Sequence, residues 1–75
     1  MHYTMHYNQH LLKDRLTAAL NDVKEYLGED KYQGLLKAAV ADHSLTFAQF
    51  RFALSFAGIE GLPVRAVWHE VLKLR

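Results

Sequence analysis

Residues 45–59, LTFAQFRFALSFAGI, contain signals for the beginning of one helix and for its end. At the beginning, Thr46 and Gln49 form a capping-box pattern: the threonine side chain accepts an early backbone amide, and the glutamine side chain reaches back to the cap. Leu45 stands where it can pack against Phe50 across this cap. The pattern therefore predicts that a helix begins at Thr46.

The predicted end of the same helix is Gly58, because glycine readily adopts the left-handed conformation that terminates helices. Ile59 can then fold back on Leu54 in a Schellman contact. Between the two ends, apolar side chains cover almost the whole circumference, and Phe52 and Phe56 lie one turn apart outside the main apolar face. A helix with so little polar surface lies either at the centre of a fold or in an interface.

On the N-terminal side, apolar residues recur at helical spacing up to Leu27, and Gly28 follows as a stop signal. The expected inner stripe of this helix consists of Leu12, Leu16, Ala19, Val23 and Tyr26. Asn8 is a good N-cap residue, so we expect this helix to begin at about Asn8 or Gln9. Residues 1–7 would then form an irregular leader, since terminal segments without a partner are usually loosely ordered.

Two more helices complete the expected set. Asp30 and Gln33 resemble a capping pair for a helix that ends near Ala41, and Pro63 suits the first turn of a last helix. The apolar spacing is helical throughout and contains no strand pattern. We expect an all-α fold, a compact bundle of three to four short helices, in which residues 8–75 form a single domain.

Length and composition restrict the function classes. A chain of 75 residues makes one domain, and without cysteine it has neither disulfides nor a thiolate metal site. The net charge of +1 lacks the basic excess that is typical of nucleic-acid binding. The N-terminus does not resemble a signal peptide, and the longest apolar-rich stretch is far too short to cross a bilayer. We therefore expect a cytoplasmic protein without membrane association.

The apolar surplus suggests a contact with another protein. The hydrophobic fraction is 51%, and Phe52, Phe56, Leu62 and Trp68 lie close together in the sequence. Either a small core absorbs all four, or they form an exposed apolar patch of the kind that marks an interface. We interpret the chain as a small non-enzymatic protein–protein interaction or regulatory (adaptor) domain. It would dock through an aromatic face of its third and fourth helices, either on a second copy as a homodimer or on another protein.

An alternative is a DNA-binding regulator, because residues 46–74 resemble a helix-turn-helix. Gly58 would form the turn, and the basic residues that could contact phosphates are Arg51, Arg65, Lys73 and Arg75. The start of the would-be recognition helix, however, holds Glu60, Gly61, Leu62 and Pro63, which offer base edges an acid and apolar surface. The competing interpretation is that the four basic residues are ordinary solvated charges.

A third hypothesis concerns metal binding by the N-terminal arm. His2, His6 and His10 recur every four residues, and Asp14 comes next in the same register. If the first helix extended to the N-terminus, these side chains would share a stripe that suits zinc, nickel or copper. A helix that begins at Asn8 would instead leave His2 and His6 in the leader.

Catalysis finds no support in the sequence. No nucleophile motif and no glycine-rich phosphate loop accompany the serines, histidines and acids. A helical domain of this size also offers little room for a concave pocket. We therefore expect no enzymatic activity, no cofactor and no small-molecule substrate.

Overall fold

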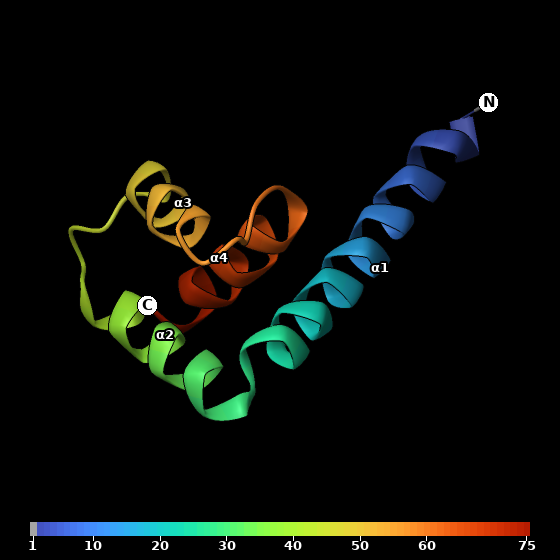
Figure 1. The fold of residues 1–75 in the computed structure, drawn as a ribbon. Coiled ribbons are helices and arrows are strands. Elements are labelled where there is room, and N and C mark those ends of the chain that lie inside the picture. Colours follow the sequence, from blue (N-terminus) through green and yellow to red (C-terminus); the bar gives the residue numbers. More distant parts are fainter. Residues whose placement is uncertain (1) are drawn as a thin grey trace.

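The computed structural model describes the backbone of residues 2–75 and the side chains of residues 12–75. Four helices follow one another along the chain: α1 (His2–Leu27), α2 (Glu29–Ala41), α3 (Phe47–Ser55) and α4 (Leu62–Leu74). The described backbone contains no strand. The fold is therefore all-α, a compact bundle of short helices, as the apolar spacing predicts (Figure 1).

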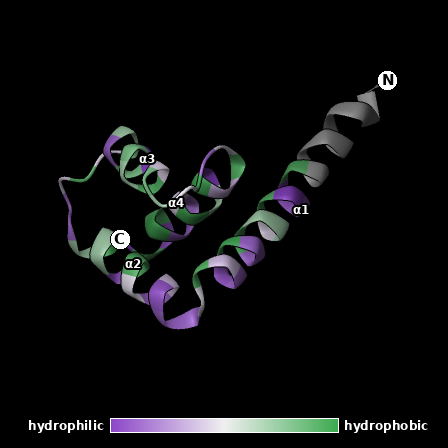
Figure 2. Cartoon of the chain, in the orientation of Figure 1, coloured by the Kyte–Doolittle hydropathy of each residue, from purple (hydrophilic) through white to green (hydrophobic). Residues whose placement is uncertain are grey.

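Helix α4 is the central element, because α1, α2 and α3 all pack against it. Its inner stripe consists of Val64, Val67 and Val71, which are completely buried. The other helices surround this stripe in Figure 1, where α1 and α2 diverge from their short connection and lie on two different sides of α4. Figure 2 shows that the connection between α1 and α2 is hydrophilic, whereas α4 is largely hydrophobic. The core thus lies along α4, away from the charged connection.

The first helix begins earlier than predicted. Its start is His2 rather than Asn8 or Gln9, so residues 2–7 are helical and not an irregular leader. The segment before Gly28 contains neither glycine nor proline, so none of its residues strongly opposes extension of the helix towards the N-terminus. Asn8 is therefore a helix-interior residue here, and its capping preference is not used.

The second helix is bounded differently from the prediction. Gly28, with φ 86°, is its N-cap residue, and no side chain caps it. Gln33 donates a hydrogen bond to Glu29 Oε1 at 3.3 Å, so the predicted capping pair of Asp30 and Gln33 is wrong. A single glycine between two helices leaves no room for a separate capping residue. The predicted end at Ala41 is confirmed, and Gly28 alone connects α1 to α2.

The third helix confirms both of its sequence signals. The backbone N–H of Gln49 donates to Thr46 Oγ1 at 3.2 Å, and the backbone N–H of Thr46 donates to the Gln49 side-chain oxygen Oε1 at 3.0 Å. After Ser55 the chain makes a turn in which Gly58 has φ 81° and the Ile59 amide donates to the Leu54 carbonyl at 3.1 Å. This is the Schellman arrangement. Because both ends are closed by local contacts, α3 has defined limits.

The last helix begins with Leu62, one residue before the predicted start, and Pro63 lies in its first turn. Gly61 is the N-cap residue. None of the described helices is long and apolar enough to span a membrane.

Candidate functional site on the third helix

Phe52 on α3 and Phe56 at its C-cap are the most exposed aromatic residues of this segment, with exposed fractions of 66% and 78%. The same helix buries Phe50 and Leu54 against the core, and these are only 2% and 4% exposed. Residues two apart point to different sides of a helix, so a helix that buries Phe50 and Leu54 must turn Phe52 and Phe56 outward. The small core does not absorb the apolar surplus of this segment.

Phe52 and Phe56 contact each other on the surface. Their ring centroids are 5.0 Å apart and the rings are at 89°, an edge-to-face arrangement that aromatic pairs prefer. The spacing of four residues brings them to the same side of the helix. The Ser55 hydroxyl between them donates to the Phe52 carbonyl at 2.6 Å. We call this pair the aromatic knob.

Trp68 and Leu62, which the sequence grouped with the knob, lie elsewhere. The Trp68 ring contacts Phe50 and Phe47, with centroid distances of 5.1 and 5.8 Å, and packs half-buried against the core. Leu62 is half-buried in the first turn of α4. The structure therefore separates the four residues into a knob and two partly buried positions, because α4 turns Trp68 towards the buried side of α3.

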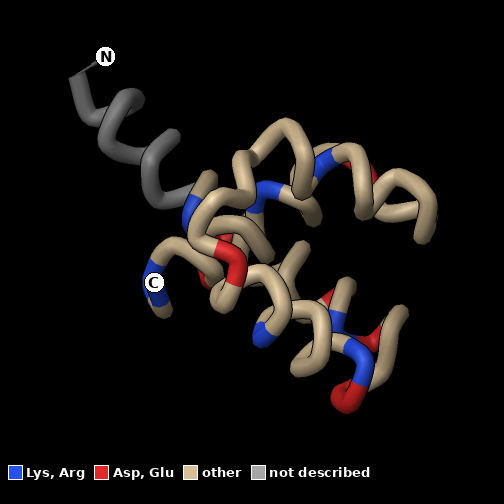
Figure 3. The backbone as a smooth tube through the Cα atoms, turned by 90° about the vertical axis from the view of Figure 1, so that its left-hand side faces the viewer, with Lys and Arg blue, Asp and Glu red and all other residues tan. Residues whose placement is uncertain are grey.

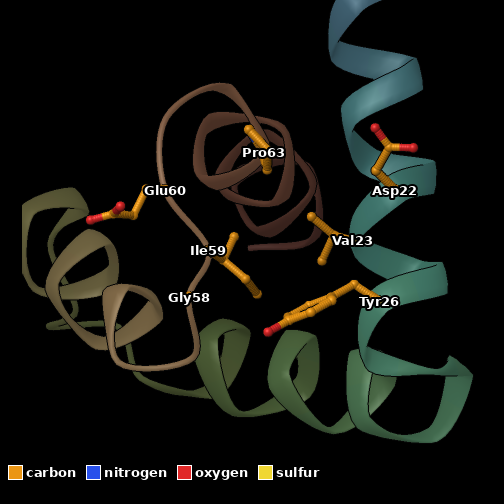
Figure 4. Close-up of a pocket in the computed structure, with 7 residues that line it drawn as sticks. All are labelled: Asp22, Val23, Tyr26, Gly58, Ile59, Glu60 and Pro63. Atoms are coloured by element: carbon orange, nitrogen blue, oxygen red, sulfur yellow. The ribbon is translucent and has the colours of Figure 1, made fainter.

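A hollow near the knob was not predicted. Tyr26 was expected on the inner stripe of α1, but its side chain is 67% exposed, and its hydroxyl donates to the Ala57 carbonyl at 3.0 Å. Beside it lies a hollow of about 240 Å³ between α1, the turn after α3 and the start of α4. Figure 4 shows Val23, Tyr26 and Ile59 pointing towards one another in this hollow. The hollow exists because Tyr26 of α1 contacts Ala57, which lies 31 residues later in the turn after α3. A pattern of neighbouring residues in the sequence could not have shown this contact.

The rim of this hollow is acidic. Asp22 and Glu60 contribute its carboxylates, and Figure 4 shows that both point away from the apolar centre. Pro63 completes the apolar wall. We call this site the acidic-rimmed hollow. Its apolar lining and its two rim charges suit an apolar side chain with a cation beside it.

A second hollow connects the acidic-rimmed hollow with the aromatic knob. It has a volume of about 450 Å³ and is lined by residues that include Arg51, Phe52, Ser55 and Glu60. Glu60 lines both hollows. The knob and the acidic-rimmed hollow therefore belong to one continuous surface, with Arg51 and Glu60 between them.

The four basic residues of the DNA-binding alternative do not form one group, and most are engaged. Arg75 donates to the carbonyls of Asp42 and Leu45 at 2.6 and 3.2 Å. Lys73 forms a salt bridge of 2.9 Å with Glu70, and the Arg65 guanidinium lies 5.8 Å from the centre of the Phe47 ring. In Figure 3 the Lys and Arg positions are spread along the whole described tube and alternate with acidic ones.

The Arg75 contacts close the loop between α2 and α3. Its guanidinium also reaches the Ala39 carbonyl at 3.4 Å and lies 5.2 Å from the centre of the Trp68 ring. In the same loop, Asp42 accepts hydrogen bonds from the Ser44 hydroxyl and amide at 2.7 and 3.1 Å. These bonds, assisted by Arg75, hold the pKa of the Asp42 carboxyl below its usual value. The role of this end of the chain is structural.

The metal hypothesis stays a prediction. The side chains of His2, His6 and His10 lie outside the described residues, and Asp14 is exposed. Among the side chains of residues 12–75, no group of three His, Asp or Glu is placed to hold a metal ion.

Comparison of the chain with family models, curated proteins and solved structures gives no match. The functional argument therefore depends on the chain's own geometry.

Proposed function

We propose that this chain is a small non-enzymatic protein-interaction domain that binds its partner through the aromatic knob. The observation that carries the proposal is the exposure of Phe52 and Phe56 beside a helix face that buries Phe50 and Leu54. Aromatic side chains are enriched among the residues that dominate binding energies, especially near hollows that can receive partner groups. The adjoining hollows provide this second feature.

The energetics favour covering the knob. Burying one exposed phenylalanine is worth about 1.5–3 kcal/mol, so covering two that are already partly shielded contributes roughly 2–4 kcal/mol. The edge-to-face contact already orders the two rings, which lowers the entropy that a partner must remove on binding. A surface of this kind has a cost in solubility for a free monomer and a benefit in a complex.

The test compares baits that differ only in the knob. The wild-type chain and the variant Phe52→Ser/Phe56→Ser are immobilised in equal amounts, with Lys37→Glu as a control on the exposed side of α2. Because both phenylalanines are exposed, the double variant should keep its helical circular-dichroism spectrum and thermal midpoint. We expect the knob variant to lose a partner that the wild type and the Lys37→Glu control retain. Identical retention by all three folded baits would refute the proposal.

The DNA-binding alternative has less support, since Arg75 and Lys73 are engaged within the chain and only Arg51 and Arg65 remain near the α3–α4 turn. It predicts binding to duplex DNA that weakens steeply with salt. Absence of binding at low salt would remove it.

A further inference from the structure

We infer that the partner of the aromatic knob is a second copy of this chain, and that each knob enters the acidic-rimmed hollow of the other copy. This inference rests on the proposed function, because it uses the same knob and names its occupant. Its support comes from three features that lie on one surface: an apolar projection, an apolar recess and a pair of opposite charges between them.

The first feature is the fit between projection and recess. The knob presents Phe56, the most exposed large apolar side chain described, while the acidic-rimmed hollow presents the apolar groups of Val23, Ile59 and Pro63 (Figure 4). Ile59 and Val23 are 5% and 3% exposed, so they form a fixed floor rather than a mobile one. Neither Phe52 nor Phe56 lines the acidic-rimmed hollow of its own chain, and both are exposed.

The second feature is the charge pattern between knob and hollow. Arg51 and Glu60 both line the second hollow there, yet neither forms a salt bridge with any described side chain. When two copies face each other with opposite orientation, the Arg51 of one copy approaches the Glu60 of the other, and the reverse pair forms at the same time. Opposite charges placed in this way fix the register of an interface.

The third feature is closure. In a two-fold symmetric dimer, residue i of one copy contacts residue j of the other and j contacts i. Here the Arg51–Glu60 region lies between knob and hollow, so a two-fold axis through it places each knob over the opposite hollow. Both knobs and both hollows are then used, and no unsatisfied site is left to recruit a third copy. The arrangement therefore gives a dimer and not a filament.

The contact area is modest, which sets the expected strength. Two knobs and two hollows form an interface at the small end of the range for specific complexes, where association is weak and reversible. We expect a dimer with a dissociation constant on the order of micromolar, so its population should change with concentration. Sedimentation velocity from about 1 µM to about 1 mM covers this range.

The decisive experiment uses two charge-reversed chains, Arg51→Glu and Glu60→Arg. Each should dimerise at least about tenfold more weakly than the wild type, because its homodimer would bring like charges together twice. When the two chains are mixed in equal amounts, both charge pairs of the mixed dimer are opposite again. We expect the mixture to dimerise with the wild-type affinity, and Lys37→Glu, mixed or alone, to behave as the wild type.

This rescue by mixing separates contacts between chains from contacts within one chain. An Arg51–Glu60 contact inside each copy would be lost in both variants and would not return on mixing. A mixture that stays monomeric, or a wild-type chain that is monomeric up to about 1 mM, would overturn the inference. The second result would leave the proposed function standing if the knob-dependent bait still retains another protein. A stable dimer that persists in Phe52→Ser/Phe56→Ser would overturn the inference, because its contact would not use the knob, and the bait comparison would then decide the proposed function separately.

A measurement without charge variants provides a second check. On dilution of the isotopically labelled wild-type chain, the amide resonances of Val23 and Ile59 in the hollow should shift together with those of Phe52 and Phe56. The amide of Lys37 should not shift. Concentration-dependent shifts confined to the knob, with the hollow unchanged, would contradict the reciprocal arrangement.

Discussion

Replacing Arg75 with alanine is expected to destabilise the bundle, although the residue is exposed and lies at the end of the last helix. Its guanidinium bridges from α4 to the loop after α2, where it donates to the carbonyls of Asp42 and Leu45 at 2.6 and 3.2 Å. The weaker contact to the Ala39 carbonyl, at 3.4 Å, lies at the limit of hydrogen-bond distance. Among the hydrogen bonds described, no other side chain of the last helix or its C-cap donates to the α2–α3 loop.

The magnitude follows from these contacts. One charge-assisted hydrogen bond contributes about 1.5–3 kcal/mol when shielded, and less at an exposed site where water competes. The stacking of the guanidinium over Trp68, 5.2 Å from the ring centre, adds about 0.5–1 kcal/mol. Holding an arginine in one conformation costs up to about 2 kcal/mol of side-chain entropy. The net loss in Arg75→Ala is therefore about 1–2 kcal/mol, which corresponds to a Tm lower by roughly 4–16 °C in a domain of this size.

The assay is thermal and urea unfolding followed by circular dichroism, with Arg75→Lys and Lys37→Ala as companions. Arg75→Lys keeps the charge but lacks the planar guanidinium whose Nη2 donates to both carbonyls while it lies over the Trp68 ring, so its Tm should fall between those of the wild type and Arg75→Ala. Lys37→Ala should leave the Tm unchanged, because Lys37 is exposed and has no described side-chain hydrogen bond. A Tm of Arg75→Ala within about 2 °C of the wild type would show that the loop is held by other contacts.

Three further predictions concern local contacts and use the same unfolding assays. Thr46→Ala removes the cap that accepts the Gln49 amide and should cost about 1 kcal/mol, whereas Thr46→Ser should keep most of the stability. Asp42 has a lowered pKa in the fold, so its contribution is present above the ordinary value of 3.8 and is lost as the pH falls through the lowered pKa. Asp42→Asn should therefore flatten the loss of stability in acid, and an unchanged pH profile would refute the assignment. Gly58→Ala should cost about 1 kcal/mol, because φ is 81° and the new methyl would lie 3.3 Å from the Tyr26 hydroxyl, and wild-type stability would contradict this reasoning.

Several features of the fold could be predicted because they depend on neighbours in the sequence. The ends of α3 follow from a cap and a glycine within a few residues of the helix, and both were confirmed. The predicted starts of α1 and α2 were wrong because they depended on local capping preferences alone. The capping preferences of Asn8 and Asp30 are real, but a capping residue acts only where the backbone leaves the helix, and neither position lies at such a point.

The candidate site could be predicted only in part. The sequence indicated an apolar surplus around Phe52 and Phe56, since these two residues lie off the main face of their helix. It also placed Trp68 in the same patch and Tyr26 in the core, and the structure reverses these two positions. Helical periodicity determines which residues share a face, whereas burial of that face depends on which helix packs against it.

The sequence by itself determined the all-α class, the break between the first two helices at Gly28 and the limits of α3, because helix formation and termination are governed by contacts within one or two turns. Only the tertiary structure decided that Arg75 closes a loop, that Phe56 is exposed and that Tyr26 and Ile59 share a hollow with Pro63. Those facts depend on how three helices pack around α4, which brings residues more than thirty positions apart into contact.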